Sequence, residues 1–158
     1  MDVFQKLYTD NYKKIIGYLT KMCNDRELAE DLTQETFYRA LLSFYYDNSA
    51  YICSKWLVKT AYNAYIDYIR KNKSGIISFN AEEHDNVFNQ SDSTVRFAIS
   101  EAMRHLPLHY KTVIILKDHC GFSYKEIAEI TGLSEPVVKV TLHRARKKFK
   151  EVYEKNDG

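Results

Sequence analysis

At 158 residues, the chain can form one ordinary domain or two small ones, and it has no run near the roughly 20 apolar residues that span a bilayer. Thirteen Tyr and eight Phe supply much of the core volume. Only five Gly and two Pro interrupt the chain, which favours long helices over sheets. The net charge of +2 excludes a uniformly basic protein, so any nucleic-acid surface has to come from local segregation of charge.

The first 44 residues predict two amphipathic helices. From Val3 to about Met22, apolar side chains recur every three or four positions, namely Phe4, Leu7, Tyr8, Tyr12, Ile15, Ile16 and Leu19. A second helix is expected from an N-cap at Asn24-Asp25, supported by Glu27, to about Ser43. Its apolar side continues through Leu28, Leu32, Thr36, Phe37, Ala40, Leu41 and Phe44.

A third helix completes the predicted N-terminal bundle over residues 1–73. Residues 45–49 are interpreted as a loop, and Ser54 is expected to cap a helix that runs to about Lys71. Charge divides between the helices, because residues 24–48 carry six acids against two bases and residues 55–73 carry five bases against one acid. The bundle is therefore expected to present an acidic and a basic surface to different partners.

Residues 74–94 are predicted to be a flexible linker. They are rich in Asn, Ser, Asp and Glu and hold no sustained helical period. Their apolar side chains can pack on either domain or on a partner; these are Ile76, Ile77, Phe79, Val87 and Phe88.

A second domain of about four helices is expected over residues 95–158. Helical patterning resumes at Val95 and breaks at Pro107, and a helix over residues 110–119 is ended by Gly121. Two more helices are predicted at about 123–130 and 134–152. The predicted fold class is therefore all-α, with two small helical domains.

The last two helices have the pattern of a helix-turn-helix. Ser123 and Glu126 form a capping box, Gly132 can take a left-handed turn, and Ser134 caps the final helix. In that final helix the core side is formed by Val138, Leu142, Ala145 and Phe149. The outward side, which would enter a major groove, carries Glu135, Lys139, Val140, His143 and Lys147. We expect Lys139 and His143 to read bases. Phosphate contacts are expected from the basic residues that follow, namely Arg144, Arg146, Lys147, Lys148 and Lys150.

Three segments together resemble the extracytoplasmic-function group of bacterial sigma factors, which are two-domain members of the sigma-70 family. They are Ala29-Glu30-Asp31-Leu32-Thr33-Gln34-Glu35-Thr36-Phe37, the run from Trp56-Leu57 through Asn63 to Asp67-Tyr68-Ile69-Arg70, and Leu142-His143-Arg144-Ala145-Arg146. They occur in the family's order over nearly the whole chain. The resemblance implies a protein that binds core RNA polymerase and directs promoter-specific initiation without being an enzyme.

The resemblance also implies roles for the first domain. The helix at 25–44 would dock on the clamp helices of the polymerase's largest subunit through Asp31, Gln34 and Glu35. The segment 45–70 would melt and capture the promoter's −10 element. There Tyr51 and Asn63 would contact the extruded base, and Lys55, Lys59 and Arg70 would contact phosphates. Against this, residues such as Trp56 and several of the tyrosines more often belong to the core than to a nucleotide platform.

The second domain would read the −35 element, although this sequence departs from the family pattern. Pro136 stands where a small residue is common, and Val140-Thr141 stands where Ser-Arg is common, which removes one expected backbone contact. By the same resemblance, the linker would thread towards the RNA-exit path and an anti-sigma factor would sequester both domains. Because the sequence has no long apolar run and its N-terminus lacks the pattern of a secretion signal, we expect the protein to stay in the cytoplasm.

Two other function classes fit the sequence less well. A stand-alone regulator would dimerise on a palindromic operator, but it leaves the acidic and basic surfaces of residues 1–70 without a role. An enzyme would have to use Cys120 beside His119, or a zinc site built from histidines together with Cys23, Cys53 and Cys120. Adjacent helical residues point about 100° apart, and the cysteines lack metal-ligand spacing, so we expect no cofactor and no metal.

Overall fold

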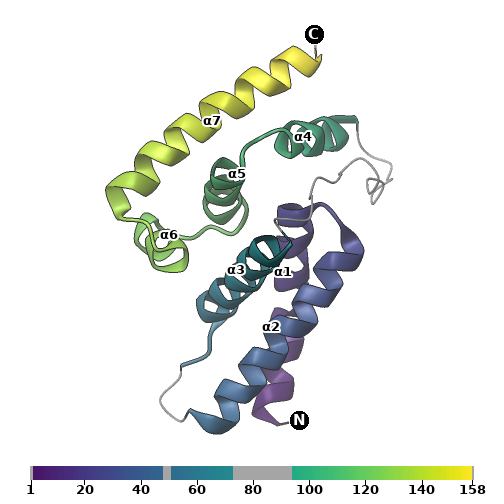
Figure 1. Ribbon diagram of the computed structural model, residues 1–158, viewed down its shortest axis with the longest axis vertical. Coiled ribbons are helices and arrows are strands. Elements are labelled where there is room, and N and C mark those ends of the chain that lie inside the picture. Colours follow the sequence, from purple (N-terminus) through teal and green to yellow (C-terminus); the bar gives the residue numbers. More distant parts are fainter. Residues whose placement is uncertain (1, 48–50, 73–93, 158) are drawn as a thin grey trace. The chain divides into compact units, whose positions relative to one another are not determined.

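The computed structural model describes residues 2–47, 51–72 and 94–157, and these contain helices but no strand. The chain divides into two compact units, Met1–Asp85 and Asn86–Gly158 (Figure 1). The predicted all-α class with two helical domains is confirmed. The predicted linker lies outside the described residues except for Thr94, which begins a helix. None of the described helices is long and apolar enough to cross a membrane.

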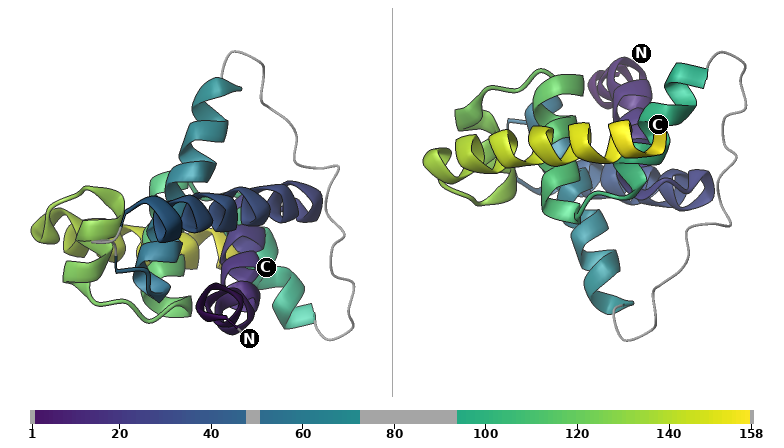
Figure 2. Two further views of the ribbon diagram at one scale, coloured as in Figure 1. Left: turned by 90° about the horizontal axis from the view of Figure 1, so that it is seen from below. Right: turned by 90° about the horizontal axis from the view of Figure 1, so that it is seen from above.

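The N-terminal unit is a bundle of α1 (Val3–Cys23), α2 (Arg26–Tyr46) and α3 (Ser54–Lys71). Each helix packs against the other two, and the C-terminal end of α3 projects beyond α1 and α2 (Figure 2). Side chains that are almost fully buried fill the centre of the bundle; the largest are Ile15, Tyr18, Leu19, Met22, Leu57 and Val58. The apolar stripe predicted for α1 faces this core mainly through its C-terminal half.

The structure corrects two predicted caps in this unit. Asn24 does not cap α2, because it ends α1 in the left-handed conformation at φ 55°. Asp25 alone is the N-cap of α2 and accepts a hydrogen bond from the Leu28 N–H. Ser54 is the first residue of α3 and not its cap. Cys53 occupies the cap position without a side-chain hydrogen bond.

The predicted loop after α2 begins later than expected. Tyr45 and Tyr46 belong to the last turn of α2, so the helix carries both rings to its end. Both rings are exposed, at 65% and 84%. Asp47 follows as the C-cap of α2, and residues 48–49 of the predicted loop lie outside the described residues.

The C-terminal unit contains α4 (Thr94–Arg104), α5 (Leu108–Ile114), a π-helical turn η3 (Ile115–His119), α6 (Tyr124–Thr131) and α7 (Glu135–Asp157). The long helix α7 packs against α4, α5 and α6, so it forms one wall of the unit's core (Figure 1). The predicted helix at 110–119 starts earlier, directly after Pro107, and its last five residues form the π turn. The Cys120 N–H donates to the Ile115 carbonyl, five residues back, at 2.9 Å.

The helix-turn-helix predicted from the caps is present. Ser123 and Glu126 form the expected capping box of α6, with hydrogen bonds of 2.9 and 3.1 Å. Gly132 ends α6 in the left-handed conformation at φ 85°. Ser134 then caps α7 by accepting from the Val137 N–H. These local signals turn the chain from α6 into α7 over a short connection.

Candidate polymerase and nucleic-acid surfaces

One face of α2 is polar and exposed along its length. It carries Glu27, Asp31, Gln34 and Tyr38, while Ala29, Leu32, Thr33, Thr36 and Phe37 point into the core. Within the described residues, Asp31 and Gln34 make neither an ion pair nor a side-chain hydrogen bond. Their carboxylate and amide groups are therefore available to a partner, which is the arrangement expected of a docking surface.

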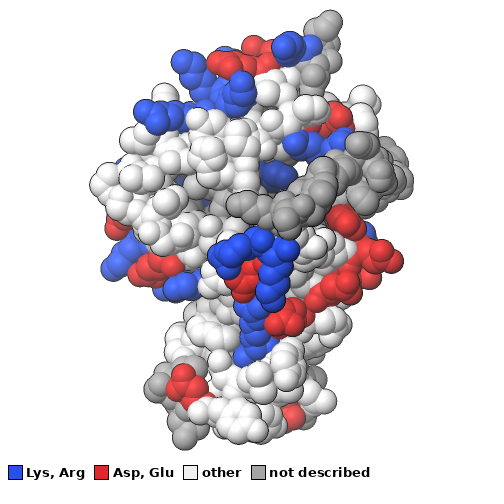
Figure 3. Space-filling model, in the orientation of Figure 1, with Lys and Arg blue, Asp and Glu red and all other residues white. Residues whose placement is uncertain are grey.

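Acidic and basic groups lie on neighbouring helices of this unit. The acids of α2 gather towards its N-terminal half, and basic side chains cover the adjoining end of α3 (Figure 3). Glu27, Glu30, Asp31 and Glu35 belong to the acidic group, and Arg70 and Lys71 to the basic group. The segregation predicted from the sequence thus becomes two adjacent surfaces in one folded unit.

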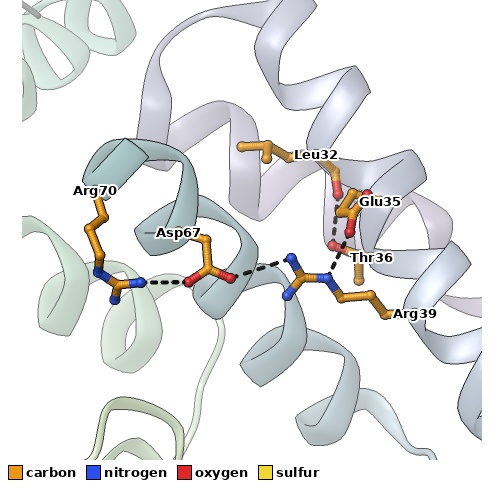
Figure 4. A network of polar contacts seen from close by, with 6 residues as sticks. All are labelled: Leu32, Glu35, Thr36, Arg39, Asp67 and Arg70. Carbon is orange, nitrogen blue, oxygen red and sulfur yellow. Dashed lines mark hydrogen bonds and ion pairs between the residues drawn. The ribbon is translucent and has the colours of Figure 1, made fainter. Parts of the chain in front are cut away.

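A chain of ion pairs crosses from α2 to α3 (Figure 4). Arg39 Nε donates to Glu35 at 2.8 Å, and Arg39 Nη2 donates to Asp67 at 3.4 Å. The other oxygen of Asp67 accepts from Arg70 Nη1 at 2.9 Å. Glu35, which was predicted to bind polymerase, is therefore held by Arg39. Arg70, which was predicted to bind a phosphate, is held by Asp67.

The predicted strand-binding residues lie along α3 and the segment before it. Lys59, Asn63 and Arg70 are exposed, and Lys55 is half-buried. The Tyr51 ring is 81% exposed, so its face is accessible for stacking on a base. These side chains belong to one helix and its immediate approach, so a single extended strand can contact them in sequence.

Exposure separates the tyrosines that can bind a nucleotide from those of the core. Trp56, Tyr62 and Tyr65 are half-buried. Burial raises the pKa of the Tyr62 hydroxyl, and burial together with Cys23, Tyr68 and Asp25 raises the pKa of Tyr65 well above its usual range. Trp56, Tyr62 and Tyr65 therefore contribute to packing, whereas Tyr45, Tyr46 and Tyr51 present their rings to solvent.

The outward face of α7 matches the prediction. Val138, Leu142 and Ala145 are buried and Phe149 is half-buried, which turns the expected DNA-facing residues outward. Lys139, Val140, His143, Arg144, Arg146 and Lys147 are all exposed. Val140 is 46% exposed and offers an apolar contact of the kind that recognises a thymine methyl group.

Two of these cationic side chains are positioned by residues outside α7. Lys139 Nζ lies 5.4 Å from the centre of the Tyr124 ring, and Lys117 Nζ lies 4.5 Å from the same centre. Arg146 donates two hydrogen bonds to Asp118, at 2.5 and 3.2 Å. This contact raises the pKa of the Arg146 guanidinium above its ordinary value.

The sequence reasoning missed the residues that hold the predicted contacts in place. They are Arg39, Asp67, Asp118 and Tyr124. Two pairs had a local signal, because Glu35 and Arg39 stand four residues apart and Asp67 and Arg70 three apart on helices. The Arg39–Asp67 and Asp118–Arg146 pairs each span 28 residues and had none. The three half-buried cysteines form no disulfide.

Two family models match separate parts of the chain. Sigma-70 region 2 matches residues 7–75, which include all of α2 and α3. Sigma-70 region 4 matches residues 88–149, which include the helix-turn-helix. The two matches cover both units and occur in the order that the sequence motifs suggested.

Similar proteins agree with the family models. The chain is 31% identical to the ECF RNA polymerase sigma factor SigM of Bacillus subtilis, over 96% of this chain and 93% of that protein. It is 32% identical to the RNA polymerase sigma factor YlaC of the same organism, over 95% and 91%. Among solved structures, the fold resembles the sigma factor RpoE of Bartonella quintana, solved with the anti-sigma factor NepR. That match has a TM-score of 0.77 and 21% identity, and it covers 96% of both chains.

A second solved structure shares the fold. It is CnrH in complex with the cytosolic domain of CnrY, with a TM-score of 0.71 and 20% identity, covering 96% of this chain and 87% of that one. Sigma factors are initiation factors and not enzymes. The chain therefore belongs to the sigma-70 family, in its extracytoplasmic-function group, and directs promoter-specific initiation by RNA polymerase.

Proposed function

We propose that the two units divide promoter recognition between them. Residues 1–73 dock on core polymerase and hold the melted −10 element, residues 74–94 link the units, and residues 95–158 bind the −35 element as duplex. The observation that carries the proposal is the pairing of an open polar face on α2 with an exposed cationic and aromatic surface before and along α3. Such a pairing serves a protein partner and an unpaired strand at once.

Docking uses Asp31, Gln34 and Glu35 of α2, against the clamp helices of the polymerase's largest subunit. Asp31 and Gln34 supply free hydrogen-bonding groups, and Glu35 adds a carboxylate whose internal partner, Arg39, is 35% exposed at its side chain. An acidic surface of this kind suits a basic partner helix, because complementary charge speeds association and sets the register.

Strand capture uses two kinds of contact. Tyr51 and Asn63 contact a base pulled from the stack, the ring by stacking and the amide by hydrogen bonding. Lys55, Lys59 and Arg70 contact phosphates of the same strand. The exposure of Tyr51, Lys59, Asn63 and Arg70 supports this assignment.

Duplex reading uses the outward face of α7. Lys139, Val140 and His143 lie near the start of the helix, where base edges are reached in helix-turn-helix complexes. Arg144, Arg146 and Lys147 contact the phosphates that flank the groove. Val140-Thr141 stands where Ser-Arg is common in the family pattern, so the preferred −35 sequence cannot be copied from relatives.

An anti-sigma protein is part of the proposal. RpoE, which shares this fold, was solved with the anti-sigma factor NepR. CnrH, which also shares it, was solved with the cytosolic domain of CnrY. We place the protein in the cytoplasm together with RNA polymerase. The path of the linker towards the RNA-exit channel is a further expectation from the family.

Run-off transcription tests the function directly. Core polymerase is assayed with and without the purified chain across a pool of genomic promoters. Initiation from a subset of promoters is expected only when the chain is present. Tight binding of duplex promoter DNA without polymerase, together with dimerisation, would instead support a stand-alone regulator and refute the proposal.

A further inference from the structure

Four side chains of alternating charge connect the polar face of α2 to the basic surface of α3 in the N-terminal unit. In Figure 4 the Arg39 side chain lies between Glu35 and Asp67, and Arg70 approaches Asp67 from the other side. Glu35 and Arg39 belong to α2, whereas Asp67 and Arg70 belong to α3. Arg39 is thus the link between a residue assigned to polymerase and a residue assigned to the strand.

We propose that Arg39 is a positioning residue that couples polymerase docking to strand binding. The inference rests on the proposed function, which gives Glu35 to polymerase and Arg70 to a phosphate. Arg39 acts by distributing its charge between Glu35 and Asp67 and does not need to touch either partner itself. Its guanidinium suits this position because a planar fork with five N–H donors can serve two carboxylates together.

The distances show which contact has room to change. The Arg39–Asp67 separation of 3.4 Å is the longest of the three, against 2.8 Å for Arg39–Glu35 and 2.9 Å for Asp67–Arg70. When Glu35 turns to a polymerase group, Arg39 keeps Asp67 as its carboxylate partner, and that contact can tighten. Asp67 then attracts Arg70 less strongly.

Exposure decides which arginine is released. The Arg70 side chain is 67% exposed and the Arg39 side chain 35% exposed, so solvent screens the Asp67–Arg70 pair more strongly. Arg70 therefore leaves Asp67 more easily and becomes available to a phosphate. By thermodynamic reciprocity, a strand bound at Arg70 favours polymerase contact at Glu35 by the same factor.

The test uses the full-length chain and a fluorescently labelled oligothymidine, because phosphate contacts do not depend on sequence. Anisotropy at low salt gives the oligonucleotide affinity of four proteins: the wild type, Glu35→Gln, Arg70→Gln and the double variant. The same four are then measured with Arg39→Gln added to each. Glu35→Gln imitates docking by removing the carboxylate charge. With Arg39 present, Glu35→Gln is expected to increase the factor by which Arg70→Gln weakens oligonucleotide binding. The expected increase is about two- to fivefold, the scale of an exposed ion pair. In the Arg39→Gln background, that gain is expected to vanish.

Two controls separate coupling from simple charge effects. Glu30→Gln removes an equally exposed α2 acid that pairs with Arg26, so its effect is expected to be the same whether Arg70 is intact or replaced by glutamine. Arg39→Lys keeps the charge without the fork, and it is expected to restore little of the coupling. Circular dichroism checks that each variant is folded.

The outcomes distinguish a failure of the coupling from a failure of the strand contact at Arg70. If Arg70→Gln weakens binding equally with Glu35 intact and in the Glu35→Gln background, while Arg39 is present, the coupling is refuted and the strand contact stands. If Arg70→Gln has no effect in any background, Arg70 is not a strand ligand, and the coupling fails together with that part of the proposed function.

Discussion

The two units arrange their charges in opposite ways. In the C-terminal unit, basic side chains concentrate on the single helix α7, where residues 134–150 carry six bases against one acid. In the N-terminal unit, acidic and basic groups stand on adjoining helices and meet through Arg39 and Asp67. A helix that serves one anionic partner needs one sign of charge. A unit that binds a protein and a strand together needs both signs, and contacts that keep them apart.

The same contrast appears in what positions the binding side chains. The direction of helix α7 is set by local features, namely the cap at Ser134 and the left-handed Gly132. In addition, Tyr124 contacts Lys139 and Asp118 contacts Arg146. The α2 and α3 surfaces are set by packing of whole helices in a three-helix core. A mutation in α7 should therefore affect the C-terminal unit and leave the N-terminal unit unchanged.

The largest expected effect is loss of the C-terminal core. Leu142 is 2% exposed, so Leu142→Ala is expected to lower the stability of this unit by about 2–5 kcal/mol. Thermal unfolding followed by circular dichroism measures the loss. Because each unit has its own core, polymerase binding through α2 should persist while duplex binding fails. Equal loss of both activities would contradict the separation.

The docking face gives the next largest effect. Replacing Asp31 and Gln34 by alanine is expected to weaken polymerase binding about tenfold or more, since truncating a hydrogen-bonded interface group typically costs about 2 kcal/mol. Surface plasmon resonance with immobilised core polymerase measures the change. Glu30→Ala removes another exposed acid of α2 that is not one of the proposed docking residues, and it serves as the matched control. Unchanged affinity of the double variant would refute the docking face.

Base reading and phosphate binding on α7 can be told apart. Lys139→Ala is expected to relax preference at one −35 position by about 1–3 kcal/mol, while Lys147→Ala weakens binding to all sequences and lowers the salt slope by about one. Selection from a randomised −35 library with the assembled holoenzyme, repeated at several salt concentrations, provides both measurements. Tyr124→Leu is expected to reproduce part of the Lys139→Ala effect, because the Tyr124 ring supports that ammonium group.

The sequence predicted features that depend on neighbouring residues and missed those that depend on distant ones. The capping box at Ser123 and the turn at Gly132 follow from local chemistry and were predicted residue by residue. The cap of α3 was misplaced because Ser54 has the right residue type, yet its hydroxyl lies buried inside the first turn. The Arg39–Asp67 and Asp118–Arg146 pairs require the packed fold, so no local spacing indicates them.

The smallest expected effects come from two glycines that give opposite results, one in each unit. Gly17 lies inside α1 and Gly132 ends α6 at φ 85°, and a Cβ added at either one meets no atom within 4 Å. Since neither substitution causes a clash, only backbone preference decides the outcome. Gly17→Ala is expected to stabilise the N-terminal unit by about 0.5–1 kcal/mol, because alanine loses less chain entropy in a helix. Gly132→Ala is expected to destabilise the C-terminal unit by about 1–2 kcal/mol, because the left-handed conformation disfavours a Cβ. Urea unfolding measures both changes, and a shift of the same sign in the two variants would contradict this account of the turn.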